Sequence, residues 1–204
     1  MEQAQPEFFN EWLSYVDRFL SPEKIIVVDS ASPMKPVFDD DRIEFISLTE
    51  NFLRAMHCTS TKYCGWSRAF LMGAFYALMN DMDYVFIEQD VLFRGDIVGT
   101  VFQEMEENGK TYAHGLWSHR YRVEQSLVMI RHLSILRFMN EYMAIRSSDG
   151  KMRPEQKFDE MSKRMNLHEL PFGYGRQRPV NFDDEVFYLQ QLSPEELKTM
   201  REIL

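Results

Sequence analysis

Cysteine is scarce in this sequence, with only Cys58 and Cys64 among 204 residues. A structural zinc site needs four ligands, so this pair supplies at most half of one, and no second pair is present. A disulfide between the two stays open. Two thiols in a chain without a visible export signal are more simply interpreted as reduced, and we expect that state.

Long apolar runs are also missing. No stretch approaches the roughly 20 uninterrupted apolar residues that a bilayer-spanning helix needs. The first residues, MEQAQPEFFNEW, are acidic and lack the basic and apolar regions of a secretory signal. These absences predict a cytoplasmic protein without a transmembrane segment. Peripheral contact with a membrane stays open.

An excess of positive charge is absent too, since 32 acidic residues outnumber 23 basic ones and the formal net charge is −9. Non-specific nucleic-acid binding depends on Lys and Arg side chains that neutralise phosphates, so we expect no nucleic-acid partner. A small phosphorylated ligand remains compatible with this charge, because a local basic cluster can oppose the overall sign. Such a cluster lies near the C-terminus and comprises Lys163, Arg164, Arg176 and Arg178.

Hydrophobic residues make up 45% of the chain and aromatic residues 14%, which suffices for the core of one α/β domain over residues 1–204. Apolar spacing predicts helices at 6–20, 65–80, about 97–108, the second part of 124–145, and the C-terminus. Gly109 is placed to cap the third helix, and Ser193 and Glu196 to cap the last. Helix 65–80 is apolar nearly all round, so we expect it to be buried.

Short apolar runs at 25–28, 42–48 and 84–87 predict strands that alternate with these helices. Such alternation predicts a mostly parallel central sheet flanked by helices. Ligands in these folds bind beyond the carboxyl ends of the strands. Two strands end there in polar residues, Asp29-Ser30 and Glu88-Gln89-Asp90, and we therefore expect a site at this edge.

The acids after the strand YVFI suggest a cation site. The two-residue period of a strand places Glu88 and Asp90 on one side of an extended chain. Side by side at a buried edge they would repel, unless a cation lies between them or one is protonated. Mg²⁺ is usually held by one or two carboxylates together with substrate phosphates. The alternative, that the acids only mark the solvated end of the strand, stays open.

The segment GWSRAFLMGAFYALMNDMDYVFIEQDVLF resembles the GT-A-type glycosyltransferases. In that family a buried helix leads into an apolar strand ending in an Asp-x-Asp motif, which binds a metal and the diphosphate of the donor. Gly65-x-Ser67-Arg68-Ala69 is similar to the helix start that precedes this motif. Asp29 is similar to an aspartate that contacts the nucleotide base. Residues 24–130 carry most of the resemblance, which implies a single GT-A-like (Rossmann-like) domain.

The resemblance implies a sugar transfer from a nucleotide-diphosphate donor to a glycan or glycolipid acceptor, with Mn²⁺ or Mg²⁺. It assigns the metal to Asp90, Glu88 and His168. The residues expected to contact the nucleotide-sugar are Asp29, Ser30, Arg68, Glu88, Gln89, Arg176 and Arg178. The chain departs from the family in two ways. Glu88 stands where the family has Asp, which makes Asp90 the main expected ligand, and a helix stands where the family usually has its first strand.

The loop FGYGRQRPVNFDD contributes two further groups to this hypothesis. Arg176 and Arg178 are suited to holding a diphosphate bidentately as the bond to the sugar breaks. The alternative is a solvated loop in which they pair with Asp183 and Asp184. If the reaction inverts the anomeric centre it needs a base, for which Glu124, Asp183 and Asp184 are the candidates. A retaining enzyme needs no such base.

A second function from another class stays open, a non-catalytic glycosyltransferase-like binding protein. The missing first strand and the change from Asp to Glu at position 88 favour it. A nucleotidyltransferase also uses acids at strand ends, but it usually brings a Gly-rich basic loop near the N-terminus, and this sequence has none.

Overall fold

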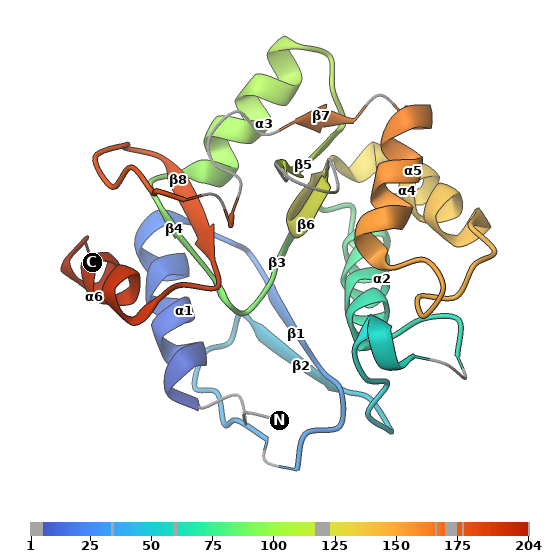
Figure 1. Ribbon diagram of the computed structural model, residues 1–204, viewed down its shortest axis with the longest axis horizontal. Coiled ribbons are helices and arrows are strands. Elements are labelled where there is room, and N and C mark those ends of the chain that lie inside the picture. The colour runs from blue at the N-terminus through green and yellow to red at the C-terminus, as the bar shows by residue number, and fades with distance from the viewer. Residues whose placement is uncertain are drawn as a thin grey trace. The chain divides into compact units, whose positions relative to one another are not determined.

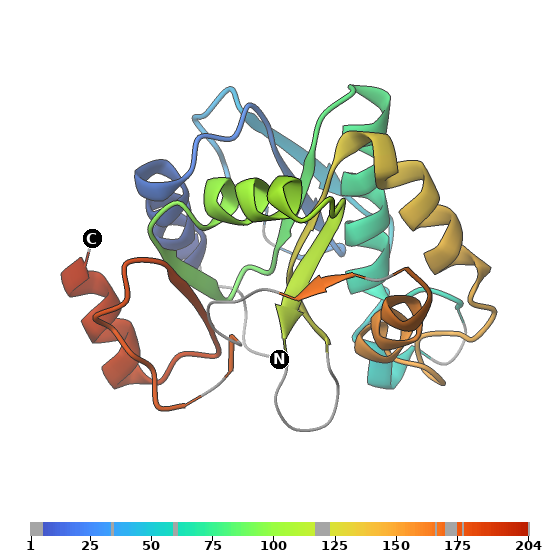
Figure 2. The ribbon, with the colours of Figure 1, turned by 90° about the horizontal axis from the view of Figure 1, so that it is seen from above.

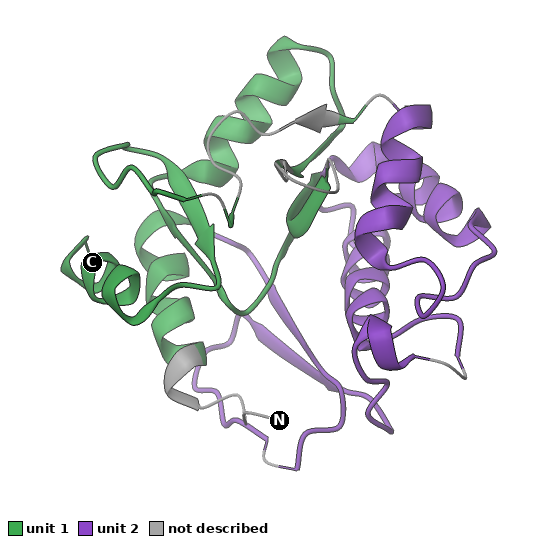
Figure 3. Ribbon diagram, viewed as in Figure 1, with its two compact units in different colours: residues 1–21, 85–129, 167–204 green, residues 22–84, 130–166 purple. Residues whose placement is uncertain are grey.

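The computed structural model describes residues 6–33, 35–58, 61–116, 123–165, 167–169, 175–176 and 178–203. It divides the chain into two compact units, drawn in green and purple in Figure 3. Unit 1 comprises Met1–Ser21, Val85–Met129 and Leu167–Leu204, and unit 2 comprises Pro22–Tyr84 and Ile130–Asn166. Each unit therefore assembles segments that lie far apart in the sequence.

Among the described residues, unit 1 contains three helices and most of the strands (Figure 1). The helices are α1 (Pro6–Phe19), α3 (Ile97–Glu107) and α6 (Pro194–Ile203). The strands are β3 (Tyr84–Ile87), β4 (Val91–Arg94), β5 (Tyr112–Leu116), β6 (Val123–Ile130), β7 (His168–Glu169) and β8 (Phe187–Gln190). All eight side chains of β6 are buried, as expected for a strand covered on both faces.

Local signals fix where the helices of unit 1 begin and end. The Asp96 carboxylate accepts a 2.8 Å hydrogen bond from Gly99 N at the start of α3. Gly109 follows that helix with φ +61°, the left-handed conformation of a C-terminal cap, which confirms its predicted role. At α6, Ser193 N donates to Glu196 Oε2 and Glu196 N donates to Ser193 Oγ, so the predicted capping box is also confirmed.

Unit 2 contains β1 (Ile25–Asp29), β2 (Ile43–Ser47), a 3-10 turn η1 (Ala55–His57), and three helices. These are α2 (Gly65–Met79), α4 (His132–Ala144) and α5 (Pro154–Met165). Helices α2 and α4 lie side by side, as Figures 1 and 2 both show. Phe70 of α2 is completely buried, and its ring lies 5.8 Å from Phe138 of α4 and 5.6 Å from Phe158 of α5. Aromatic packing thus holds the three helices together.

The mixed α/β class is confirmed, but the single, mostly parallel central sheet is wrong for the described part of the chain. The strands form three small sheets, β1-β2, β3-β6-β5-β7 and β4-β8. The first pair is parallel, β5 pairs with β7 in parallel, and β4 pairs with β8 antiparallel. A parallel neighbour needs a crossover of a dozen or more residues. Only a short turn at Gln89-Asp90 separates β3 from β4, so β4 cannot be a parallel neighbour of β3. It pairs with β8 instead.

Two further expectations have a clear outcome. The expectation that α2 is buried is wrong at two positions, because the side chains of Phe75 and Met79 are 54% and 60% exposed. Cys58 and Cys64 are not joined by a disulfide, and both are buried. None of the helices among the described residues combines the length and apolarity needed to cross a membrane.

Candidate functional site

The acidic residues Glu88 and Asp90 flank a tight turn between β3 and β4. Val91 N donates a 3.0 Å hydrogen bond to Glu88 O, which closes the turn, and Gln89 at its tip is exposed. Glu88 N donates to Ser126 O of β6 at 2.9 Å, so the neighbouring strand fixes the start of the turn. Both acidic side chains are half-buried. A turn, rather than the period of an extended strand, therefore sets the position of the two carboxylates.

Gln190 joins the two carboxylates. Its Nε2 donates to Glu88 Oε2 at 2.6 Å and to Asp90 Oδ1 at 3.2 Å. The fold places it there because β8 pairs with β4 in a register that sets Gln190 opposite Val91, the residue after Asp90. Gln125 of β6 adds a second amide, with Nε2 3.4 Å from Glu88 Oε1. The two acids are thus gathered by amides from two different strands.

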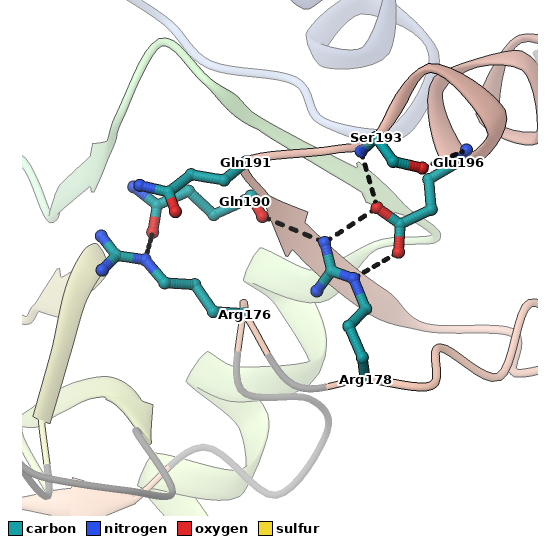
Figure 4. Close-up of a pocket in the computed structure, with 6 residues that line it drawn as sticks. All are labelled: Arg176, Arg178, Gln190, Gln191, Ser193 and Glu196. Carbon is teal, nitrogen blue, oxygen red and sulfur yellow. Dashed lines mark hydrogen bonds and ion pairs between the residues drawn. The ribbon is translucent and has the colours of Figure 1, made fainter.

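Arg176 lies on the other side of the Gln190 amide. Its Nε donates to Gln190 Oε1 at 2.9 Å (Figure 4). The same Nε lies 3.5 Å from Glu124 Oε2. The chain turns into this position at Gly175, where φ is +59° and a Cβ atom would lie 2.9 Å from Cε2 of Tyr188. An arginine and two acids are therefore linked through one glutamine side chain.

Tyr188 is completely buried beside this group. Burial raises the pKa of Tyr188 well above its ordinary value, the charge of Glu124 adds to that rise, and Arg176 opposes it. Glu124 itself has only 1% of its side chain exposed. The candidate base Glu124 therefore lies inside the protein, in contact with Arg176 and close to a neutral tyrosine.

Arg178 is held differently from Arg176. Its guanidinium forms an ion pair with Glu196 and donates to Gln190 O at 3.2 Å. Partial burial raises the pKa of Glu196, but the hydrogen bonds from Arg178 and from Ser193 N outweigh that effect and keep the pKa below its ordinary value. Arg176, Arg178, Gln190, Gln191, Ser193 and Glu196 line an open pocket of about 380 Å³ (Figure 4).

The remaining candidate residues of unit 1 are Asp183, Asp184 and His168, which come from other segments of the chain. Asp183 and Asp184 are exposed in the turn before β8, where Asn181 Nδ2 donates to Asp184 Oδ1 at 2.6 Å. His168 pairs with Ala113 in the β5–β7 ladder, and its side chain lies outside the described residues. Among the described residues, no group of three or more His, Cys, Asp or Glu side chains is placed to hold a metal ion.

Three of the residues expected to contact the nucleotide-sugar, Asp29, Ser30 and Arg68, lie in unit 2. The Asp29 carboxylate accepts from Ser32 N at 2.9 Å and from Ser47 Oγ at 3.1 Å. Ser30 Oγ accepts from Phe52 N at 3.0 Å, and the Arg68 guanidinium stacks 3.5 Å above the Phe52 ring. A Cβ atom on Gly65 would lie 3.1 Å from Ser30 Oγ, so the start of α2 approaches the end of β1 closely. Asp29, Ser30 and Arg68 are therefore brought together around one loop.

Sequence reasoning missed Gln125 and Gln190. Neither belongs to a motif, and the role of Gln190 depends on a strand pairing across 100 residues. The apolar run FYLQ before Ser193 was the available signal, since it is a short buried strand. Comparison with known proteins adds no assignment, because no protein-family model and no curated protein matches this sequence.

Proposed function

We propose that this protein is a metal-dependent glycosyltransferase that moves a sugar from a nucleotide-diphosphate donor to a glycan or glycolipid acceptor. The observation that carries the proposal is the convergence of Glu88 and Asp90 on Gln190, with Arg176 on the opposite side of the same amide. Two carboxylates and an arginine side by side suit a divalent cation and the diphosphate that it neutralises.

The donor set fits Mn²⁺ or Mg²⁺. Hard cations take oxygen ligands, and Mg²⁺ typically uses one or two carboxylates plus phosphate oxygens and water. Glu88 and Asp90 would hold the cation, which would supply charge neutralisation for the departing diphosphate. Arg176 would bind a phosphate oxygen directly. Arg178, in an ion pair with Glu196, would have to leave that carboxylate before it could contact the donor.

A non-catalytic, donor-binding role is the second candidate, and the position of the candidate bases favours it. Glu124 is buried against Arg176, and Asp183 and Asp184 lie in an exposed turn of their own. An inverting transfer needs a base within hydrogen-bonding reach of the acceptor hydroxyl. A retaining transfer does not, so the two candidates are separated by measuring turnover rather than binding.

A thermal-shift screen with UDP, GDP and CMP, each with and without Mn²⁺, tests the proposal. A ligand of the folded protein at about 100 times its Kd stabilises it by roughly 2.7 kcal/mol, a shift that such a screen resolves. We expect at least one nucleotide to raise the Tm, and to do so only with Mn²⁺. If none does, the proposal fails. Binding without hydrolysis of any nucleotide-sugar would favour the non-catalytic role.

A further inference from the structure

The two amides beside the acidic turn have no role in sugar transfer as proposed above, yet both are deeply buried. Gln190 is 1% exposed and Gln125 is 5% exposed. The NH₂ group of Gln190 donates to one oxygen of each carboxylate, at 2.6 Å to Glu88 and 3.2 Å to Asp90. An N–H group shared by two carboxylates takes the position that a bridging cation would take, because both present positive charge to the same oxygens.

The second amide, that of Gln125, lacks one of its hydrogen-bond partners. Its Oε1 is buried and has no hydrogen-bond partner, although Nε2 of the same amide lies 3.4 Å from Glu88 Oε1. A buried carbonyl oxygen without a donor is unfavourable, and such atoms in native proteins usually mark a missing water, ion or ligand. Amide carbonyl oxygens are ordinary ligands of hard divalent cations.

We propose that Gln190 is itself a ligand of the divalent cation, and that its NH₂ group takes the place of the cation when the cation is absent. The inference rests on the proposed function, which puts the cation at Glu88 and Asp90. A half-turn of the terminal amide exchanges Oε1 and Nε2 with little change of shape. Oε1 then faces the cation, in a set of oxygens that includes both carboxylates.

The same half-turn changes the environment of Arg176. In the structure Arg176 Nε donates to Gln190 Oε1 at 2.9 Å. After the turn the amide presents NH₂ to the guanidinium, and two donors cannot form a hydrogen bond. The guanidinium is released toward another acceptor, for which a diphosphate oxygen is suited. Cation binding therefore prepares the arginine, and we expect the cation to bind before the diphosphate.

Nuclear magnetic resonance of the side-chain amides tests this proposal without measuring activity. Protein labelled with ¹⁵N is titrated with Mg²⁺, and the heat of binding is followed in parallel by calorimetry. We expect both NH₂ proton signals of Gln190 to move upfield, because these protons lose their carboxylate acceptors. The midpoint of this shift should coincide with the midpoint of Mg²⁺ binding measured by calorimetry. The amide of Gln191, which is exposed and adjacent in the chain, is the matched control and should keep its signals.

The variant Gln190→Lys assigns the Gln190 signals and tests whether Mg²⁺ binds beside Gln190. An ammonium group between the two carboxylates preserves their pairing but should weaken Mg²⁺ binding by at least ~10-fold, as loss of a supporting group at a metal site does. Gln191→Lys adds the same charge outside the cluster and should change binding little. Unchanged Mg²⁺ affinity in Gln190→Lys contradicts the proposal.

The outcomes separate this inference from the proposed function. If Mg²⁺ binds and the Gln190 signals stay in place, Gln190 is not a ligand, while the cation at Glu88 and Asp90 stands. If neither Mg²⁺ nor Mn²⁺ binds to the wild-type protein, with or without UDP, both proposals are overturned.

Discussion

The Lys157 ammonium lies 2.5 Å from the Asp149 carboxylate, and both side chains are completely buried in unit 2. Asp149 Oδ2 also accepts a 2.7 Å hydrogen bond from Cys64 N, the residue that precedes α2. Nζ of Lys157 lies 5.1 Å from the ring centre of Tyr63 and 5.4 Å from that of Tyr142. One buried ion pair thus joins α5, the loop before it and the start of α2.

Replacing Lys157 by Met should destabilise the protein strongly. The variant leaves the Asp149 carboxylate buried without its cation, a change that costs about 3–5 kcal/mol in comparable cases. The measurement is the free energy of unfolding in urea. Lys163→Met on the same helix is the matched control. Its side chain is 61% exposed and its ion pairs lie at the surface, so we expect less than about 1 kcal/mol. Equal effects of the two variants would contradict the structural role of the pair.

Gly73→Ala should also be destabilising, although alanine favours helices. A Cβ atom at position 73 would lie 2.6 Å from Oη of Tyr84, whose hydroxyl donates to Phe70 O at 2.9 Å. Overpacking of this kind costs about 1–3 kcal/mol, more than the gain of roughly 1 kcal/mol from helix propensity. Urea unfolding measures the change.

The double variant Gly73→Ala with Tyr84→Phe is the control for this steric explanation. Removing the hydroxyl takes away the closest contact, although ring atoms Cε2 and Cζ stay 2.9 Å and 3.0 Å from the Cβ position. The double variant should therefore be somewhat more stable than the sum of the two single effects predicts. Simple additivity would show that the hydroxyl contact is not part of the cause.

The capping box of α6 should make the stability of the folded protein depend on pH. The pKa of Glu196 is lowered in the folded protein by Arg178 and Ser193, which outweigh the opposite effect of its burial. A lowered folded pKa gives stability that is present above the ordinary glutamate pKa and is lost as the pH falls through the folded value. Glu196→Gln should therefore lower the Tm at about pH 7, and the difference from the wild type should shrink as the pH falls below the ordinary glutamate pKa. A constant difference across that range would exclude Glu196 as the titrating group.

Asp90→Asn should weaken cation binding and slow donor hydrolysis or transfer. The variant keeps the shape of the side chain and a hydrogen-bonding oxygen but removes one of the two charges at the proposed cation site. We expect a loss of about 10–100-fold in Mn²⁺ affinity, measured by electron paramagnetic resonance, and a matching loss of turnover. Asp81→Asn is the control, an exposed acid in the turn after α2. Equal turnover in the two variants would remove Asp90 from the reaction.

Local signals allowed most elements to be predicted from the sequence. Gly109 and the Ser193–Glu196 pair mark helix ends through chemistry within a few residues, and the structure confirms both. Pairing is different, because β4 and β8 come from distant segments and no local pattern encodes which strands meet or in which direction. The outer face of α2 shows a related limit. Phe75 and Met79 make the helix apolar all round, yet both are exposed.

In the candidate site, too, the features set by neighbouring residues were predictable and those set by distant strands were not. That Glu88 and Asp90 lie together was predictable, since only Gln89 stands between them in the chain. That Arg176 would share an amide with them was not, because the link runs through Gln190 on β8. Glu124 was a candidate base, but the strand that carries it is buried along its whole length. Burial on both faces follows from the arrangement of neighbouring strands, which lies beyond the residues around Glu124.

The pairing of β4 with β8 has a consequence for biosynthesis. Gln190 follows Glu88 by 102 residues, so Glu88 and Asp90 leave the ribosome long before the glutamine that forms hydrogen bonds with both. At roughly 5–20 residues per second, the nascent chain carries two adjacent carboxylates for about 5–20 seconds with no amide to bridge them. The polar centre of unit 1 is thus a late product of translation, assembled only when the C-terminal segment emerges.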